Sequence, residues 1–186
     1  KNATSQATTQ KGEKYLGKNV LVGNHNRDAS GNEGINTAKF DLYLASDKTG
    51  PSATVNGNTV PSDITEFGTL AEGLYPLNSQ SRSSYVKDGK EDLALLINKG
   101  LAVPTTASSP KSSITEIFFH MGNNYQKSLF DSKNVPYSKG CQTSVNYPNS
   151  RPVHNAFMKE VGSNFNGSYY LRSKPVLTTP TIVPKQ

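Results

Sequence analysis

The sequence predicts a mainly β domain, built of short strands joined by turns, with one or two short helices. Only 33% of its 186 residues are hydrophobic and tryptophan is absent, while 15 residues are Gly and 11 are Pro. Gly and Pro, with the frequent Ser, Thr and Asn, favour turns over long helices. A chain of this length buries the core of one domain without disulfide bridges. We therefore expect one folded domain with polar ends.

The two ends differ from the domain in composition. Residues 1–13 are polar, with almost nothing to bury, and are typical of a flexible leader. Residues 175–186 contain three prolines and predict an extended tail, which leaves residues 14–174 for the folded domain. No run of about eighteen apolar residues is present, so we expect no integral membrane segment. The start at Lys1, without methionine, is typical of a processed or trimmed chain.

Short apolar runs predict the strands of the sheet. They are rich in β-branched and aromatic residues, and turn-forming residues follow them. The runs are residues 15–22, 40–45, 92–98, 114–119 and 169–171. Asn56-Gly57 lies between β-branched residues in the stretch 54–60 and predicts a short hairpin. Residues 79–92 are polar and predict a loop.

One short helix is expected at about residues 152–161. Pro152 suits the first turn of a helix, and Ser150 before it suits a cap. Apolar residues recur along one side of the stretch, which gives it a face to bury. Gly162 lies just beyond the expected end, where a glycine is common.

The chemistry of the sequence centres on its one cysteine, Cys141. The apolar run 114–119 ends at His120, and seventeen residues then separate His120 from Ser138-Lys139-Gly140-Cys141. The glycine lets the backbone turn just before the thiol, so we expect the cysteine to be displayed. A thiol becomes a nucleophile as the thiolate and needs a base or a cation close by, for which His120 and Lys139 are the candidates. The competing interpretation is a buried structural cysteine and a structural histidine.

These residues resemble the signature of the L,D-transpeptidases of the YkuD type. That signature is a histidine, fourteen to seventeen residues, and then Ser/Thr-x-Gly-Cys; His120, Ser138, Gly140 and Cys141 match it. The resemblance is specific at these positions, weaker over residues 39–162 and absent at both ends. It implies an L,D-transpeptidase-like β-sandwich or barrel and a divergent member of the family.

The resemblance also implies a role for each matching residue. Cys141 would be the nucleophile and His120 the base that takes its proton and returns it to the leaving amine. Ser138 would orient His120 through its carbonyl or hydroxyl. The backbone N–H groups of Gly140 and Cys141, with Lys139, would form the oxyanion hole.

The chain departs from the family at two positions. Lys139 stands where a histidine is usual, and Thr143 stands where the family carries arginine or asparagine two residues after the cysteine. Another group must then bind the carboxylate of the substrate, because a carboxylate in a cleft needs a cation or several donors. Arg151 is our candidate and Lys139 the other. We add Asn123 and Tyr137, which flank the motif residues, as substrate-binding candidates.

The charge, the absence of other motifs and the two remaining histidines narrow the range of possible functions. A net charge of +6 suits any anionic partner, but the basic residues are scattered and no compact Lys/Arg block predicts nucleic-acid binding. No metal-ligand spacing and no phosphate-binding loop is present, so we expect neither a metal nor a cofactor. His25 is interpreted as a surface residue, and His154 as a packed or exposed helical histidine.

Three functions remain open from the sequence. The first is an enzyme of the bacterial cell envelope, periplasmic or secreted, that acts as a monomer on peptidoglycan stem peptides through a Cys141 thioester. An amine acceptor would make it an L,D-transpeptidase, and water an L,D-carboxypeptidase. The second is a non-catalytic module that binds cell wall or protein on the same fold, for which Thr143 is the best support. The third is a secreted antibacterial toxin with the same chemistry.

Overall fold

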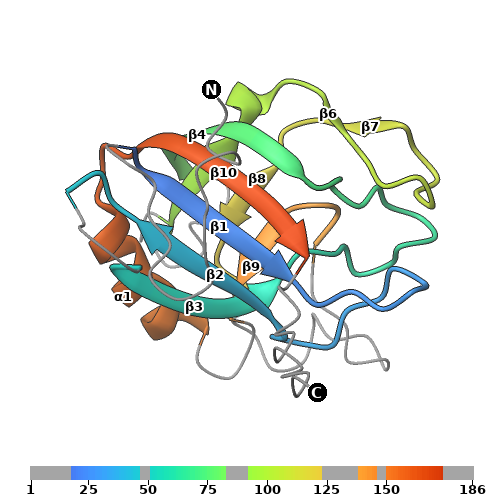
Figure 1. The fold of residues 1–186 in the computed structure, drawn as a ribbon, viewed down its shortest axis with the longest axis horizontal. Helices are drawn as coiled ribbons and strands as arrows, with labels where there is room; N and C mark the ends of the chain where they lie inside the picture. Colours follow the sequence, from blue (N-terminus) through green and yellow to red (C-terminus); the bar gives the residue numbers. More distant parts are fainter. Residues whose placement is uncertain (1–17, 47–50, 83–91, 123–137, 146–149, 174–186) are drawn as a thin grey trace, which may run out of the picture.

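The computed structural model describes residues 18–46, 51–82, 92–122, 138–145 and 150–173. They form a closed barrel of eight strands, with one helix and a 3-10 turn, which confirms the mainly β prediction (Figure 1). In chain order the elements are β1 (Val20–His25), β2 (Ala38–Tyr43), β3 (Ala53–Asn58), β4 (Gly73–Arg82), β5 (Asp92–Ile97), η3 (Asn98–Gly100), β6 (Val103–Pro104), β7 (Ser113–Ile114), β8 (Phe118–His120), β9 (Gln142–Ser144), α1 (Ser150–Val161) and β10 (Asn166–Ser173). The expected leader, 1–13, and the expected tail, 175–186, lie outside the described residues.

The barrel closes in the order β1-β10-β4-β5-β8-β9-β3-β2, while β6 and β7 pair with each other as a separate hairpin. Two of the barrel pairs, β1 with β10 and β8 with β9, are parallel, and the other pairs are antiparallel. A closed barrel leaves no exposed strand edge, so the backbone groups of neighbouring strands satisfy one another.

Alternate side chains of each strand fill the barrel, as the twofold period of a strand requires. Phe40 of β2 packs on Phe119 of β8 with ring centroids 4.8 Å apart, and on Tyr169 of β10 at 6.5 Å. All three rings are fully buried. These contacts join strands that are far apart in the sequence, and the aromatic area they bury is a large part of the core.

Helix α1 packs against β3 and β5, which flank the short strands β8 and β9 (Figure 1). Its buried side includes Phe157, Met158 and Val161, so the expected apolar face is confirmed. The helix ends before Gly162, which has φ +83° and donates its N–H to the carbonyl of Met158 at 3.0 Å. The helix begins at Ser150, two residues earlier than expected. No helix of the described chain has the length and apolar character to cross a membrane.

The predicted hairpin at Asn56-Gly57 is wrong. Both residues lie inside β3, which runs between β2 and β9. A Cβ atom on Gly57 would overlap the carbonyl oxygen of Thr143 in β9, so the glycine marks a close approach of two strands. The same residue type signals a turn or a close contact, and only the neighbouring strand decides between them.

Three other boundaries differ from the sequence prediction. The first strand continues through Gly23 to His25, because Gly23 lies against the Tyr169 hydroxyl in the core. The run 114–119 divides into β7 and β8 around Glu116, which has φ +54°. Residues 79–82 belong to β4, although their composition predicted a loop. In the first and third cases pairing with another strand outweighed local preference.

We predict that Gly57→Ala destabilises the barrel by about 2 kcal/mol, because the added methyl group must push β9 away from β3. Chemical denaturation measures the change. Gly162→Asn is the control, since nothing lies within 4 Å of its Cβ position and Asn tolerates a positive φ. Equal stability of the Gly57→Ala variant and the native protein would contradict the close approach.

Candidate thiol site

The pairing of β8 with β9 brings His120 and Cys141 near each other in the fold. Phe119 is paired with Gln142 and His120 with Thr143, and Phe119 and Gln142 point into the barrel. By alternation His120 and Thr143 lie on the outer face, and Cys141 lies directly before β9, at the end of the turn. Cys141 precedes the partner of His120 by two residues, which puts the two Cα atoms roughly 8 Å apart for ordinary strand spacings. Residues twenty-one apart in the sequence are thus diagonal neighbours.

The tautomer of His120 follows from its hydrogen bond. Nδ1 lies 2.6 Å from the carbonyl oxygen of Met121, and a carbonyl only accepts, so Nδ1 carries the proton. In the neutral ring Nε2 then holds the lone pair, which is the state that a general base needs. His120 is only 8% exposed, so its ring is held in place at the end of β8.

Ser138 fixes the turn before the thiol. Its buried hydroxyl accepts the Gly140 N–H at 3.0 Å and donates to the Cys141 carbonyl at 2.7 Å. Its own carbonyl accepts the N–H and the hydroxyl of Ser62 at 2.8 and 3.1 Å. These bonds tie the turn to itself and to the loop that holds Ser62.

Gly140 lies in a tight turn, as the sequence predicted. Its φ is +130°, which a side chain rarely adopts, and a Cβ atom would lie 3.0 Å from the carbonyl oxygen of Gly68. The turn is therefore pressed against the neighbouring loop, and Cys141 emerges from it, partly exposed, directly before β9.

The hydrogen bonds of the turn change the roles that the resemblance implied for Ser138 and for the Gly140 N–H. The hydrogen bonds found for the Ser138 hydroxyl and carbonyl go to Gly140, Cys141 and Ser62, and the carbonyl that orients His120 is that of Met121. The Gly140 N–H is committed to Ser138, so it does not serve as an oxyanion donor in this arrangement. Sequence spacing could not show either point, because both depend on how the turn closes.

Gln142 connects the thiol turn to the barrel interior. Its side-chain amide donates to the Gly140 carbonyl at 3.3 Å, and its oxygen accepts the Tyr169 hydroxyl at 2.9 Å. Burial raises the pKa of Tyr169 well above its usual value, so this phenol remains a donor at all physiological pH. The position of Cys141 is thus set by core contacts as well as by the turn.

The substrate-binding candidates divide into three groups. Lys139 is exposed, with its ammonium 5.7 Å from the centroid of the Phe67 ring. Arg151 is half-buried in the first turn of α1, where the sequence predicted a loop position. Asn123 and Tyr137 lie outside the described residues, so their roles stay predictions.

Thr143, which stands where the L,D-transpeptidase signature has arginine or asparagine, is fully buried beside His120 in the register. Its hydroxyl has no hydrogen-bond partner within the described part of the chain. A buried hydroxyl without a partner costs free energy, so such groups are rare in folded proteins.

The other two histidines have local partners. His154 is fully buried; its Nε2 donates to the Leu93 carbonyl at 2.9 Å and its Nδ1 lies 2.8 Å from the Ser144 hydroxyl, so it joins α1 to β5 and β9. His25 was expected at the surface, but its side chain is only 12% exposed and lies 2.6 Å from the Glu72 carboxylate. Burial and the charge of Arg27 lower the pKa of His25, while Glu72 opposes the change. Neither histidine lies in the thiol turn. His154 is the packed helical histidine that the sequence predicted, whereas His25 is more buried than predicted.

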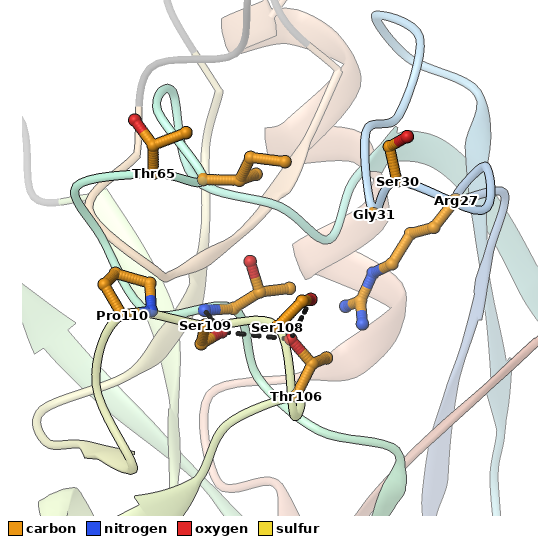
Figure 2. A pocket seen from close by; sticks show the side chains of 10 residues that line it. Arg27, Ser30, Gly31, Thr65, Thr106, Ser108, Ser109 and Pro110 are labelled. Atoms are coloured by element: carbon orange, nitrogen blue, oxygen red, sulfur yellow. Dashed lines mark hydrogen bonds between the residues drawn. The ribbon is translucent and has the colours of Figure 1, made fainter.

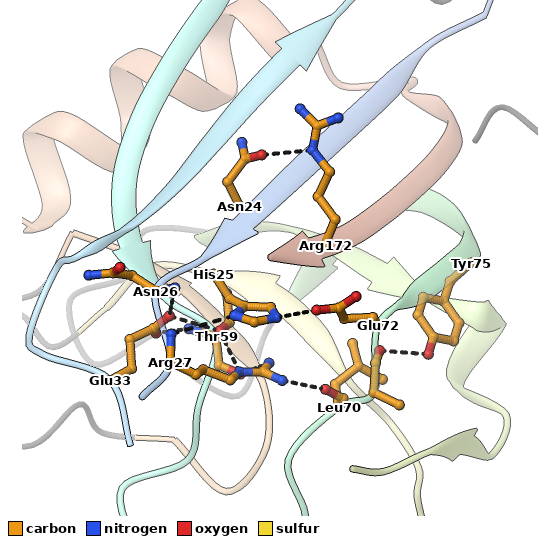
Figure 3. Close-up of polar contacts among 11 residues, drawn as sticks. Asn24, His25, Asn26, Arg27, Glu33, Thr59, Leu70, Glu72, Tyr75 and Arg172 are labelled. Carbon is orange, nitrogen blue, oxygen red and sulfur yellow. Dashed lines mark hydrogen bonds and ion pairs between the residues drawn. The ribbon is translucent and has the colours of Figure 1, made fainter. Parts of the chain in front are cut away.

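Sequence reasoning missed the polar cluster around Arg27, at the end of the barrel where β1 and β3 finish (Figure 3). Arg27 donates to the hydroxyl and carbonyl of Thr59 and to the carbonyl of Leu70. Glu33 accepts from the Thr59 N–H and hydroxyl on the other side. The sequence signal was an arginine inside a turn-rich stretch, which is typical of a surface residue. The described residues contain no group of three potential metal-ligating His, Cys, Asp or Glu side chains.

We predict that Ser138→Ala lowers both the stability and the reactivity of the thiol, whereas Ser138→Thr retains both. The Ala variant leaves the buried Gly140 N–H without its acceptor, at a cost of about 1–3 kcal/mol. Denaturation and the rate of Cys141 alkylation by iodoacetamide measure the two effects. An Ala variant that unfolds and reacts like the native protein would show that the turn does not need this hydroxyl.

Comparison of the chain with protein-family models, with curated proteins and with solved structures found no match. The likeness to the L,D-transpeptidases therefore rests on the four motif residues of the sequence. It does not rest on similarity over the length of the chain.

Proposed function

We propose that the protein is a cysteine-dependent acyl transferase that acts on L,D-linked stem peptides of peptidoglycan. The observation that carries the proposal is the position of His120. His120 ends β8, its partner in the adjacent parallel strand is Thr143, two residues after Cys141, and the Met121 carbonyl holds the ring with the proton on Nδ1. A base oriented by a third group beside a partly exposed thiol is the general pattern of an activated nucleophile.

The reaction follows from these two groups. His120 Nε2 takes the thiol proton, and the Cys141 thiolate attacks the peptide carbonyl to form a C–S bond and a tetrahedral oxyanion. As the C–N bond breaks, the imidazolium returns the proton to the departing amine of a D-amino acid. A thioester on Cys141 remains, and the acyl group leaves with the next nucleophile.

The acceptor decides the reaction type. When an amine attacks the thioester, His120 takes the proton of the amine, the C–S bond breaks and a new peptide crosslink forms. When water attacks, the product is a shortened peptide with a free carboxylate. The first outcome is L,D-transpeptidation and the second is L,D-carboxypeptidase activity, and both regenerate the thiol.

The donors for the oxyanion differ from the sequence expectation. Since the Gly140 N–H bonds to Ser138, the proposal assigns the role to the Cys141 backbone N–H and to the Lys139 ammonium, which is exposed beside the turn. For the substrate carboxylate, Arg151 remains the candidate with Lys139, and Asn123 and Tyr137 complete the proposed binding set. The proposal keeps the protein a monomer of the bacterial cell envelope, where such a substrate is found.

We predict that Cys141→Ala folds normally and loses all turnover of a disaccharide tetrapeptide, because no other thiol is present in the chain. Mass spectrometry of the products separates the candidates: shortened peptide indicates a carboxypeptidase and crosslinked peptide a transpeptidase. Unchanged substrate with the native protein would favour the binding module. Turnover that survives in the Ala variant would refute the thioester mechanism.

We predict that His120→Gln lowers the acylation rate by roughly a hundred- to ten-thousandfold, the usual range for loss of general acid-base catalysis. Single-turnover mass spectrometry of the Cys141 thioester measures this rate. His154→Gln is the control, because His154 bonds to Ser144 and Leu93 and should affect stability alone. A large loss of acylation rate in His154→Gln, with little change in His120→Gln, would assign the role of the base to His154 on α1.

A further inference from the structure

A cavity of about 370 Å³ lies beside the polar cluster around Arg27, at the end of the barrel where β1 and β3 finish (Figure 2). Its wall carries the Arg27 side chain and six hydroxyl side chains, from Ser30, Thr65, Thr69, Thr106, Ser108 and Ser109. Figure 2 shows the guanidinium of Arg27 pointing toward the hydroxyls of Thr106 and Ser108. A concave site with one cation and several hydroxyl groups suits a small polar anion.

The guanidinium of Arg27 has more N–H donors than it uses in bonds to the protein. It has five N–H bonds and uses three, to the hydroxyl and the carbonyl of Thr59 at 3.1 and 2.9 Å and to the carbonyl of Leu70 at 3.0 Å. Two N–H bonds, one on each terminal nitrogen, have no acceptor in the described chain. All three acceptors are neutral, and no described carboxylate lies within 4 Å of the guanidinium.

The nearest acidic partner, Glu33, is already occupied. Its carboxylate accepts four hydrogen bonds, from the Asn26 N–H, the Asn58 amide, and the N–H and hydroxyl of Thr59. Thr59 stands between Glu33 and Arg27, so the two charges attract each other without direct contact. Burial lowers the pKa of Arg27, but an arginine remains protonated, and its charge is available to the cavity.

The walls of the cavity are held before any ligand enters. Asp28 caps the turn that follows Arg27, accepting the N–H groups of Ser30 and Asn32 at 2.9 Å each. On the facing wall the Ser109 hydroxyl accepts the Thr69 N–H at 3.0 Å and lies 3.0 Å from the Thr106 hydroxyl. Such preorganisation reduces the entropy cost of binding.

We propose that this cavity is a binding subsite for a small carboxylate, such as the end of an amino acid or a short peptide. Two available N–H bonds match the two oxygens of a carboxylate. A dianionic phosphate would bring a second negative charge close to Glu33 and Glu72 with only one cation to balance it. The surrounding hydroxyl groups both donate and accept, so they suit polar substituents on the ligand.

The subsite lies close to the thiol turn. The Thr59 carbonyl that accepts from Arg27 lies 3.5 Å from the amide nitrogen of Gln142, the residue after Cys141. The loop that lines the cavity with Thr65 is bonded through Ser62 to Ser138. Binding itself does not require Cys141 to be catalytic.

The test measures the binding of N-acetyl-D-alanine to the Cys141→Ala protein by calorimetry and by the NMR signal of the Arg27 Nε–H. Three variants are compared in that background. Arg27→Gln removes the cation, Ser108→Leu fills the cavity without touching the bonds of Arg27, and Lys159→Gln removes one exposed positive charge from α1 as a matched control. Because Cys141 is absent from every sample, failure of the acyl-transfer proposal does not affect the result.

We predict a loss of affinity of roughly ten- to a hundredfold in Arg27→Gln, as expected for a charged hydrogen bond, and a similar loss in Ser108→Leu. Lys159→Gln should bind as the parent does. If Arg27→Gln fails to fold, the affinity of Ser108→Leu alone decides whether the cavity binds the carboxylate. Unchanged affinity in Ser108→Leu, equal binding of the C-terminal amide, or tighter binding of inorganic phosphate would each overturn the assignment.

Discussion

The parallel pairing of β8 with β9 holds the barrel and the candidate site together. It closes the barrel between β5 and β3, and the same register pairs His120 with Thr143, two residues after Cys141. Each of the two strands is only three residues long, so few ladder hydrogen bonds hold them. The pairing therefore relies on contacts at its edges. Gly57 permits β3 to approach β9, and His154 bonds to Ser144 from the helix side.

The position of the thiol turn is also fixed by contacts with buried neighbours. Ser138 closes the turn, Gly140 presses it against Gly68, and Gln142 fixes its far end to Tyr169 in the core. A group whose position is set by buried neighbours has little freedom to move, which is what a nucleophile beside a base requires. The core and the candidate site are therefore parts of one arrangement, and damage to either changes both.

The sequence predicted the parts of the fold that depend on local preference. The helix before Gly162, the strand of β5 and the strand around Tyr169 were confirmed because apolar spacing and a glycine stop are local signals. The hairpin at Gly57 was wrong because a glycine serves turns and close contacts alike. The local signal for β8 placed His120 correctly at a strand end, but it did not show the break at Glu116.

From the sequence alone it follows that the chain is mainly β, that it has one thiol, and that a glycine turn precedes this thiol at a fixed distance from His120. Those features depend on composition and on neighbours in the chain. The folded barrel was needed to show which carbonyl orients His120, where the Gly140 N–H is used, and that Arg27 faces a cavity near the thiol turn. Arg27 and Gln142 lie more than a hundred residues apart in the chain, and barrel closure brings both to the Thr59 carbonyl. Such proximity is a property of strand order, which no local pattern in the sequence contains.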